Sequence, residues 1–268
     1  MLKDITLGQY FPGNTIAHRL DPRTKILLVA LYIVALFCAK NIFSYGLMAL
    51  TLFGCVKASK VPFKTMVKGL KPVVFIVVFT AVLNLFFTPG ERNLVEVGFI
   101  RISDTGLSNA VFMVARILLL IMGTFLMTYT TSPISLTDGL EQLLGGLKKF
   151  RVPVHELAMM MSIALRFIPT LIEETDKIMS AQKARGADFE SGNLLEKAKA
   201  LIPILVPLFI SAFRRADELA TAMECRCYHG GEGRTKLHVL KYESRDYVAL
   251  VLGALVLALI LVLRRFGI

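Results

Sequence analysis

Two short strings, each with an arginine between small residues, are the strongest candidates for chemistry in this 268-residue sequence. They are Ala184-Arg185-Gly186 and Cys225-Arg226-Cys227, and their arginines are 41 residues apart. An aspartate lies nine residues before each arginine, at Asp176 and at Asp217. A guanidinium can form a bidentate pair with a carboxylate, and small neighbours leave it free to enter a groove on a partner.

Both arginines are expected at the C-terminal end of a helix, where the helix dipole favours a positive charge. Gly186 suits the residue at which a chain leaves a helix. The second string has no glycine there, so its helix is expected to end differently, nearer Gly230-Gly231. The alternative is two ordinary helix ends with solvated arginines, and the local sequence leaves it open.

Three other groupings lack the spacing that their chemistry requires. Cys225, Cys227 and His229 do not form a Cys-x₂₋₄-Cys pair, and no second ligand cluster follows them. His155-Glu156 has Met159 where a zinc protease has its second histidine. The glycines of 230–236 lack the order of a phosphate-binding loop. We expect no catalytic residue, no metal and no cofactor, and any ATP to be bound on another subunit.

The elements that carry the two strings belong to a strongly apolar chain. It is 55% hydrophobic and 19% charged, with a mean hydropathy of +0.62, whereas soluble domains average about 25% charge. Five apolar stretches are candidate membrane spans, the shorter ones with flanking residues included. They are roughly 26–39, 42–56, 73–88, 107–130 and 247–263, with a tight turn at Lys40-Asn41. The predicted fold is an all-α polytopic membrane protein with about five transmembrane helices and a cytoplasmic helical insertion.

Basic residues predict which side of the membrane each loop faces, because cytoplasmic loops are rich in lysine and arginine. They gather before the first stretch and between the second and third. These residues are Arg19, Arg23, Lys25, Lys57, Lys60, Lys64, Lys68 and Lys71. The N-terminus and the insertion 132–246 are therefore expected in the cytoplasm and loop 88–106 outside. Arg264 and Arg265 then lie outside, a mild departure from the rule.

The net charge of +11 is distributed in a way that excludes a nucleic-acid-binding protein. Residues 133–245 hold 16 Lys/Arg and 14 Asp/Glu, whereas the rest of the chain holds 15 and 6. The excess lies beside the predicted spans and not on the portion that would have to bind nucleic acid.

The insertion is expected to consist of helices. They are predicted at about 135–147, 153–184 and 194–222. The third is expected to be interrupted by Pro203 and Pro207. The apolar runs 157–168 and 201–213 are only about a dozen residues long, which favours buried or interfacial helices. A paired membrane crossing by these two runs is the alternative.

Two polar residues fall inside predicted spans. Arg116 lies in the fourth and Asn84 in the third, and intramembrane polar groups are functional candidates. For Arg116 we favour the simpler interpretation that it snorkels or pairs with a protein carbonyl.

The residues before the first span carry a more specific signal. They read Gly8-Gln9-Tyr10-Phe11-Pro12-Gly13-Asn14 and then His18-Arg19-Leu20-Asp21-Pro22-Arg23-Thr24-Lys25. These strings resemble the entry segment of the transmembrane T component (EcfT/CbiQ-like) of energy-coupling factor (ECF) vitamin and metal importers. Ala184-Arg185-Gly186 resembles the first coupling motif of that family, and Arg226 lies where the second is expected. The resemblance runs from about residue 8 to the end.

The resemblance implies a non-enzymatic coupling subunit in a bacterial cell membrane. Such a subunit holds a substrate-binding S component, and its coupling helices dock on two ABC-type ATPases. ATP-driven motion then reorients the S component for uptake of vitamins or other micronutrients. The implied ATPase-coupling residues are Ala184, Arg185, Gly186, Cys225, Arg226 and Cys227. The implied domains are 1–131 with four spans, 132–246 with the coupling helices and 247–268 with the last span.

The alternative function is a self-contained secondary transporter or channel with a cytoplasmic regulatory domain. Secondary transporters often have two repeated hydrophobic halves and interrupted helices at the midplane. Here the repeat lies in the insertion, and charged midplane residues are nearly absent. A membrane-embedded enzyme, the third class, would need a catalytic motif that the sequence lacks.

Overall fold

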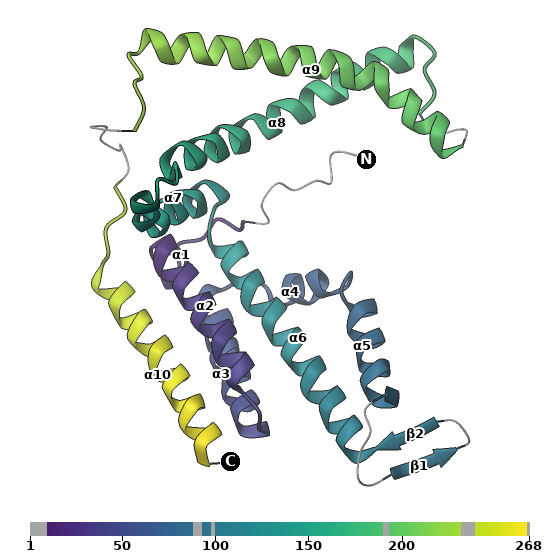
Figure 1. The fold of residues 1–268 in the computed structure, drawn as a ribbon, viewed down its shortest axis with the longest axis vertical. Coiled ribbons are helices and arrows are strands. Elements are labelled where there is room, and N and C mark those ends of the chain that lie inside the picture. Colours follow the sequence, from purple (N-terminus) through teal and green to yellow (C-terminus); the bar gives the residue numbers. More distant parts are fainter. Residues whose placement is uncertain (1–9, 88–92, 98–99, 190–192, 232–238, 267–268) are drawn as a thin grey trace. The chain divides into compact units, whose positions relative to one another are not determined.

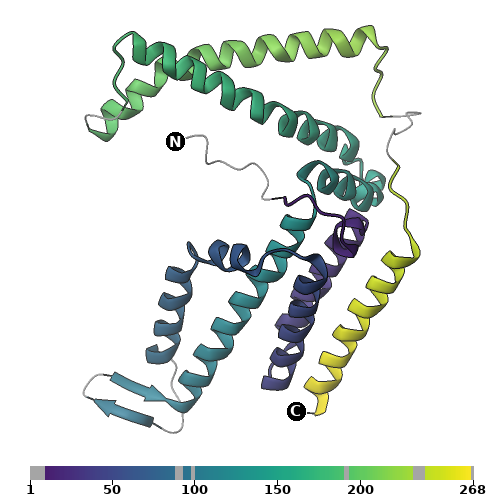
Figure 2. The same ribbon diagram turned by 180° about the vertical axis from the view of Figure 1, so that it is seen from behind.

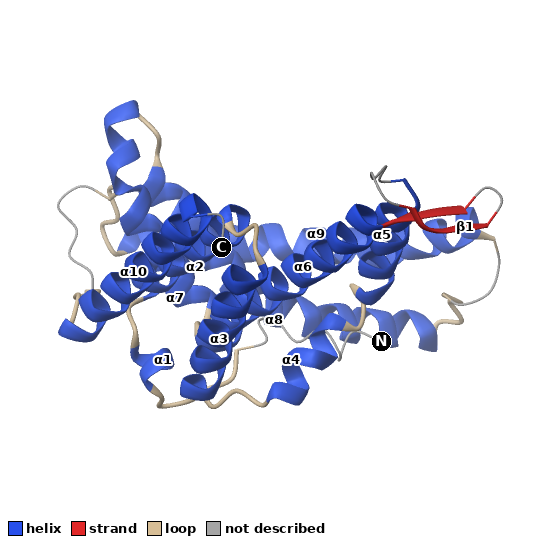
Figure 3. Ribbon diagram, turned by 90° about the horizontal axis from the view of Figure 1, so that it is seen from below, coloured by secondary structure: helices blue, strands red, loops and turns tan. Residues whose placement is uncertain are grey.

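The computed structural model describes residues 10–87, 93–97, 100–189, 193–231 and 239–266 (Figures 1 and 2). They form two compact units. The bundle unit comprises residues 8–139 and 240–268, and the insertion unit comprises residues 140–239. Both units are built of helices, which confirms the predicted fold class. Within the described ranges, strands occur in a single hairpin (Figure 3).

The bundle unit contains the five helices that the sequence predicts as spans. Its helices are α1 (Ile16–Arg19), α2 (Pro22–Cys38), α3 (Ile42–Ser59), α4 (Phe63–Leu70), α5 (Val74–Phe87), α6 (Asp104–Thr130) and α10 (Ser244–Phe266), and α7 (Pro133–Leu143) crosses the boundary between the units. The spans correspond to α2, α3, α5, α6 and α10. The turn predicted at Lys40-Asn41 is confirmed. Strands β1 (Asn93–Val97) and β2 (Ile100–Ser103) pair antiparallel before α6.

Length and composition decide which helices could cross a bilayer. α3, α6, α10 and, in the insertion unit, α8 (Val154–Ala184) meet both criteria, and α4 with α5 meets them as a pair bent by 62°. α2 has 17 residues, about 26 Å of helix, which is slightly less than the roughly 30 Å of hydrocarbon. The apolar part of α8 is thus more extensive than the dozen residues that the sequence suggested.

Close packing holds the bundle unit together. Leu36 of α2, Met48 of α3 and Ile260 of α10 are completely buried in one cluster. Arg116 of α6 donates from Nε to the hydroxyl of Tyr45 at 2.9 Å and from Nη2 to the carbonyl of Ala39 at 3.4 Å. The interpretation that Arg116 pairs with a protein carbonyl is confirmed.

The charged string before the first span closes one end of the bundle. Asp21 accepts hydrogen bonds from the amide of Arg23 at 2.9 Å and from its guanidinium at 2.7 Å. Asp246, at the start of α10, accepts from the amide of Asp21 at 2.8 Å. Lys25 donates to the carbonyl of Thr130 at 2.8 Å, at the end of α6. Residues close to the chain's two ends are thereby joined. Gly8 and Gln9, which begin the other N-terminal string, lie outside the described residues.

The insertion unit consists mainly of two long helices. A 3₁₀ segment, η2 (Leu144–Phe150), leads from α7 to α8, and α9 (Leu194–Cys225) follows. Asn193 and Glu196 form a capping box at the start of α9. The expected interruption of α9 is wrong, because the helix continues through Pro203 and Pro207. The first predicted helix ends earlier than expected, at Leu143.

Candidate coupling sites at two helix ends

The first candidate site is the C-terminal end of α8. Ala184 is the last helical residue, and Arg185 follows as the cap with φ −85° and ψ 4°. Gly186 adopts a left-handed conformation with φ +87°. The amides of Gly186 and of the next residue donate to the carbonyls of Lys183 and Gln182, both at 3.0 Å. This pair of bonds is a Schellman motif, and it leaves Arg185 exposed to solvent.

The second candidate site, at the end of α9, has the same geometry. Cys225 is the last helical residue, and Arg226 follows with φ −94° and ψ 14°. Cys227 has a φ of +54°. The amides of Cys227 and of the next residue donate to the carbonyls of Glu224 at 2.8 Å and Met223 at 3.1 Å. Arg226 is exposed, as are both cysteines.

The prediction that the second helix ends nearer Gly230-Gly231 is wrong. Cys227 takes the left-handed position that Gly186 takes in the first copy, although this conformation costs a residue with a Cβ about 1–2 kcal/mol. Gly231 instead lies against the ring of His155, and a Cβ added to it would come within 2.3 Å of that ring. The chain thus folds back from the end of α9 to the start of α8. The rest of the glycine-rich string, 232–236, lies outside the described residues.

The repeat is longer than the two arginine strings. The carbonyl of Asp176 accepts a hydrogen bond from the hydroxyl of Ser180 at 2.7 Å, and that of Asp217 accepts from Thr221 at 2.9 Å. Ser180 and Thr221 are also 41 residues apart, a correspondence that the sequence analysis missed. Each copy therefore repeats an aspartate, a hydroxyl side chain and an arginine on one helix.

The two helices meet at equivalent positions of the repeat. Glu174 of α8 accepts from the guanidinium of Arg215 at 2.5 Å and from the hydroxyl of Ser211 at 3.0 Å, both on α9. These bonds lower the pKa of the Glu174 carboxyl below its usual value, first through Arg215 and then through Ser211. Glu174 and Arg215 are themselves 41 residues apart. We call this cluster the crossing contact.

The crossing contact lies equally far along the chain from the two arginines, so that it defines two arms of equal length. An arm here means the stretch from the crossing residue to the arginine: 174–185 on α8 and 215–226 on α9. Each arm advances 11 residues, about 16 Å of helix. Figures 1 and 2 show α8 and α9 crossing, with their C-terminal ends at opposite ends of the pair.

A second polar contact joins α8 and α9 closer to the C-terminal end of α8. The amide nitrogen Nε2 of Gln182 donates to the carbonyl of Pro203 at 3.2 Å. In a regular helix that carbonyl would accept from the amide of residue 207, but Pro207 has no N–H. Gln182 thus supplies the donor that the proline removes, which helps α9 to remain continuous.

The family model CbiQ, described as a cobalt transport protein, matches residues 13–237. The energy-coupling factor transporter transmembrane protein EcfT of Clostridium kluyveri is 56% identical over 266 residues, covering 99% of this chain and 98% of the relative.

The chain belongs to the CbiQ/EcfT family. EcfT of Bacillus subtilis is 49% identical over 261 residues, covering 97% of this chain and 98% of the relative. EcfT of Acidaminococcus fermentans is 53% identical over 270 residues, covering 100% and 99%. The family consists of transmembrane components of ECF transporters, and its members act as coupling subunits. The family resemblance inferred from the N-terminal strings is thereby confirmed.

The structure places the six predicted coupling residues at two matching helix ends, while their contacts with a partner stay a prediction. Sequence reasoning missed Glu174, Gln182 and Arg215, which join the two helices. A signal was available, because Glu174 and Arg215 have opposite charges at the 41-residue offset. In the described part of the chain, His, Cys, Asp and Glu side chains form no group of three that could hold a metal.

Proposed function

We propose that this chain transmits ATP-driven motion from two ABC-type ATPase subunits to a substrate-binding S component, for uptake of vitamins or other micronutrients across a bacterial cell membrane. The N-terminus and residues 132–246 face the cytoplasm, between the spans of 1–131 and the last span in 247–268. ATP hydrolysis takes place on the partner subunits, so this subunit is not an enzyme. Arg185 docks on one ATPase and Arg226 on the other.

The observation that carries the proposal is the pair of matching helix ends. Both arginines are exposed caps of Schellman motifs, and both lie 11 residues beyond the crossing contact. Two related ATPases present two related grooves, and two equal arms can enter them in equivalent ways. A guanidinium suits such a groove because it forms a geometrically specific pair with a carboxylate.

The exposed apolar side chains of the insertion unit fit the second part of the proposed role, which is contact with an S component. Ile202, Phe209 and Phe213 of α9 and Met160 of α8 are each more than half exposed. Large apolar side chains that are exposed in this number mark a contact with a protein or with lipid. An S component held at the membrane surface would cover it, and this also accounts for the apolar composition of α8 without a membrane crossing.

The test is a pair of charge reversals. Arg185→Glu combined with Arg226→Glu is expected to abolish uptake, while the subunit still inserts in the membrane and retains its S component. The matched control is Arg166→Glu combined with Arg214→Glu, which reverses one exposed arginine on each of the same helices away from its end. The measurements are substrate uptake and co-purification of each subunit. Wild-type recovery of both ATPases with the end variant would contradict the docking role.

A further inference from the structure

A row of exposed lysines runs from the last turn of α3 to the end of α4 in the bundle unit. It consists of Lys57, Lys60, Lys64, Lys68 and Lys71. The sequence contains no aspartate or glutamate from Pro22 to Gly90, and the ion pairs recorded among the described residues involve none of these lysines. Within the described part of the chain, these lysines therefore have no carboxylate within ion-pair distance.

The exposed surface of α4 has an apolar half beside its basic half. At about 100° per residue, Lys64, Lys68 and Lys71 fall within an arc of about 60°. Phe63 and Val67 fall on the adjoining arc, and they are 52% and 47% exposed. This arrangement is typical of a helix that lies in the membrane interface. Its lysines are then at the lipid headgroups, and its apolar side chains are among the acyl chains.

The position of α4 in the bundle agrees with an interfacial location. Gly69 lies so close to α6 that an added Cβ would come 2.7 Å from the ring of Phe125 and 3.1 Å from the hydroxyl of Tyr129. α6 ends at Thr130, so α4 packs on the last turns of a spanning helix. The 62° bend between α4 and α5 then turns the chain from this level toward the bilayer.

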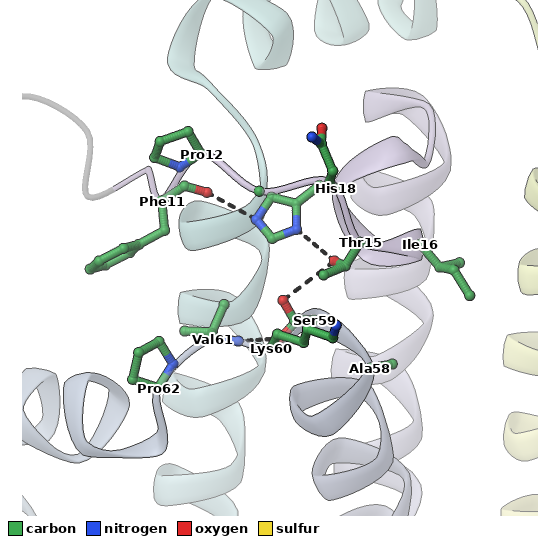
Figure 4. Close-up of a pocket in the computed structure, with 12 residues that line it drawn as sticks. Phe11, Pro12, Thr15, Ile16, His18, Ala58, Ser59, Lys60, Val61 and Pro62 are labelled. Atoms are coloured by element: carbon green, nitrogen blue, oxygen red, sulfur yellow. Dashed lines mark hydrogen bonds between the residues drawn. The ribbon is translucent and has the colours of Figure 1, made fainter.

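A pocket of about 620 Å³ opens where the lysine row begins. Its walls are residues 11–16 and 18 on one side and residues 58–62 on the other (Figure 4). Thr15 joins the walls, because its hydroxyl donates to the carbonyl of Ser59 at 3.3 Å. His18 lines the pocket and bonds the carbonyl of Phe11 at 2.9 Å. The volume is in the range of sites that hold small ligands.

Lys60 lines the same pocket in an unusual backbone conformation. It caps α3 with φ +54° and ψ 19°, a left-handed conformation that few residues other than glycine adopt. Such conformations persist where the surrounding structure imposes them, and they gather at binding sites. Here the conformation coincides with a cation at the pocket wall.

We propose that this pocket and the exposed surface of α4 bind an anionic phospholipid. The phosphate of the headgroup lies in the pocket beside Lys60, Lys64 in the first turn of α4 adds a second positive charge, and the acyl chains cover Phe63 and Val67. The charge explains why the lipid is anionic, and the adjoining apolar arc explains why it is a lipid and not free phosphate. The assignment of this lipid to the cytoplasmic leaflet rests on the membrane orientation given under the proposed function, and no other part of the proposal does.

The experiment compares lipids retained by the intact transporter complex. The complex is purified in detergent, incubated with equal amounts of phosphatidylglycerol and phosphatidylcholine, and analysed by native mass spectrometry. The wild type is expected to retain phosphatidylglycerol in excess. Lys60→Gln with Lys64→Gln is expected to reduce that retention roughly tenfold or more, because each lysine near a lipid surface contributes about 1 kcal/mol.

Two control variants separate charge from folding. Lys60→Arg with Lys64→Arg keeps both charges and is expected to retain the lipid. Lys197→Gln with Lys199→Gln removes two exposed lysines of α9 and is expected to change nothing. Equal retention of the two lipids by the wild type would overturn the proposal, as would an equal loss in the α9 variant. Displacement by inorganic phosphate would indicate a phosphate site instead. Loss of a protein subunit with unchanged lipid would assign the surface to that subunit.

Discussion

The two helix ends of the insertion unit reach one geometry with different residues. In the first, glycine occupies the left-handed position after Arg185, and in the second, Cys227 does so with φ +54°. Both ends make the same two backbone hydrogen bonds and both arms are equally long. The comparison teaches that the position of the arginine relative to the crossing contact is kept, while the residue that ends the helix can vary at a modest cost in stability.

Among the changes that test this comparison, disruption of the crossing contact is expected to have the largest effect on uptake. Glu174→Arg places a second guanidinium beside that of Arg215 at the crossing. The repulsion between them should change the position of the two arms relative to each other. Uptake is expected to fall about two- to thirtyfold, the range for residues that carry coupling between sites. The exchanged pair Glu174→Arg with Arg215→Glu should restore most of it. Glu173→Arg is the matched control at an exposed neighbour. If the exchanged pair restores nothing and the control is equally harmful, the equal arms have no role in coupling.

The contact between Gln182 and Pro203 supports only the first arm and should have a smaller effect. Gln182→Leu leaves the Pro203 carbonyl without its donor and should destabilise the packing of the two helices by about 1 kcal/mol. In a Pro207→Ala background, the restored N–H can bond that carbonyl within the helix, so the cost should largely disappear. A double-mutant cycle followed by hydrogen exchange in α9 measures the difference. An equal cost in both backgrounds would mean that Pro207 does not create the need for Gln182.

An exchange of the end residues tests the comparison most directly and should have the smallest effect. Cys227→Gly should make local opening of the second end less favourable by about 1 kcal/mol, and Gly186→Ala should favour opening of the first end by a similar amount. Gly145→Ala is the control, because that glycine has open space and no positive φ. Hydrogen exchange of the amides of Ala187 and Tyr228 reports on each end. Unchanged exchange in Cys227→Gly would show that the cysteine is not strained.

Sequence reasoning succeeded where the physical cause is local. The five apolar stretches, the turn at Lys40-Asn41 and the end of α8 follow from composition, turn residues and the preference of glycine for a left-handed position. It failed at the end of α9, because glycine propensity pointed to Gly230-Gly231 while backbone hydrogen bonding required a left-handed residue at Cys227. It also failed at Pro203 and Pro207, since propensity takes no account of a donor from another helix.

The sequence by itself determined that this is a helical membrane protein of the CbiQ/EcfT type, with two arginines at equivalent positions of a repeat. Hydropathy, charge and spacing are properties of short segments, so they can be read without a structure. Only the tertiary structure decided that Glu174 meets Arg215, that Gln182 bonds the carbonyl freed by Pro207, and that Asp246 bonds Asp21. These contacts join residues between 21 and 225 positions apart, and their partners are chosen by how helices pack.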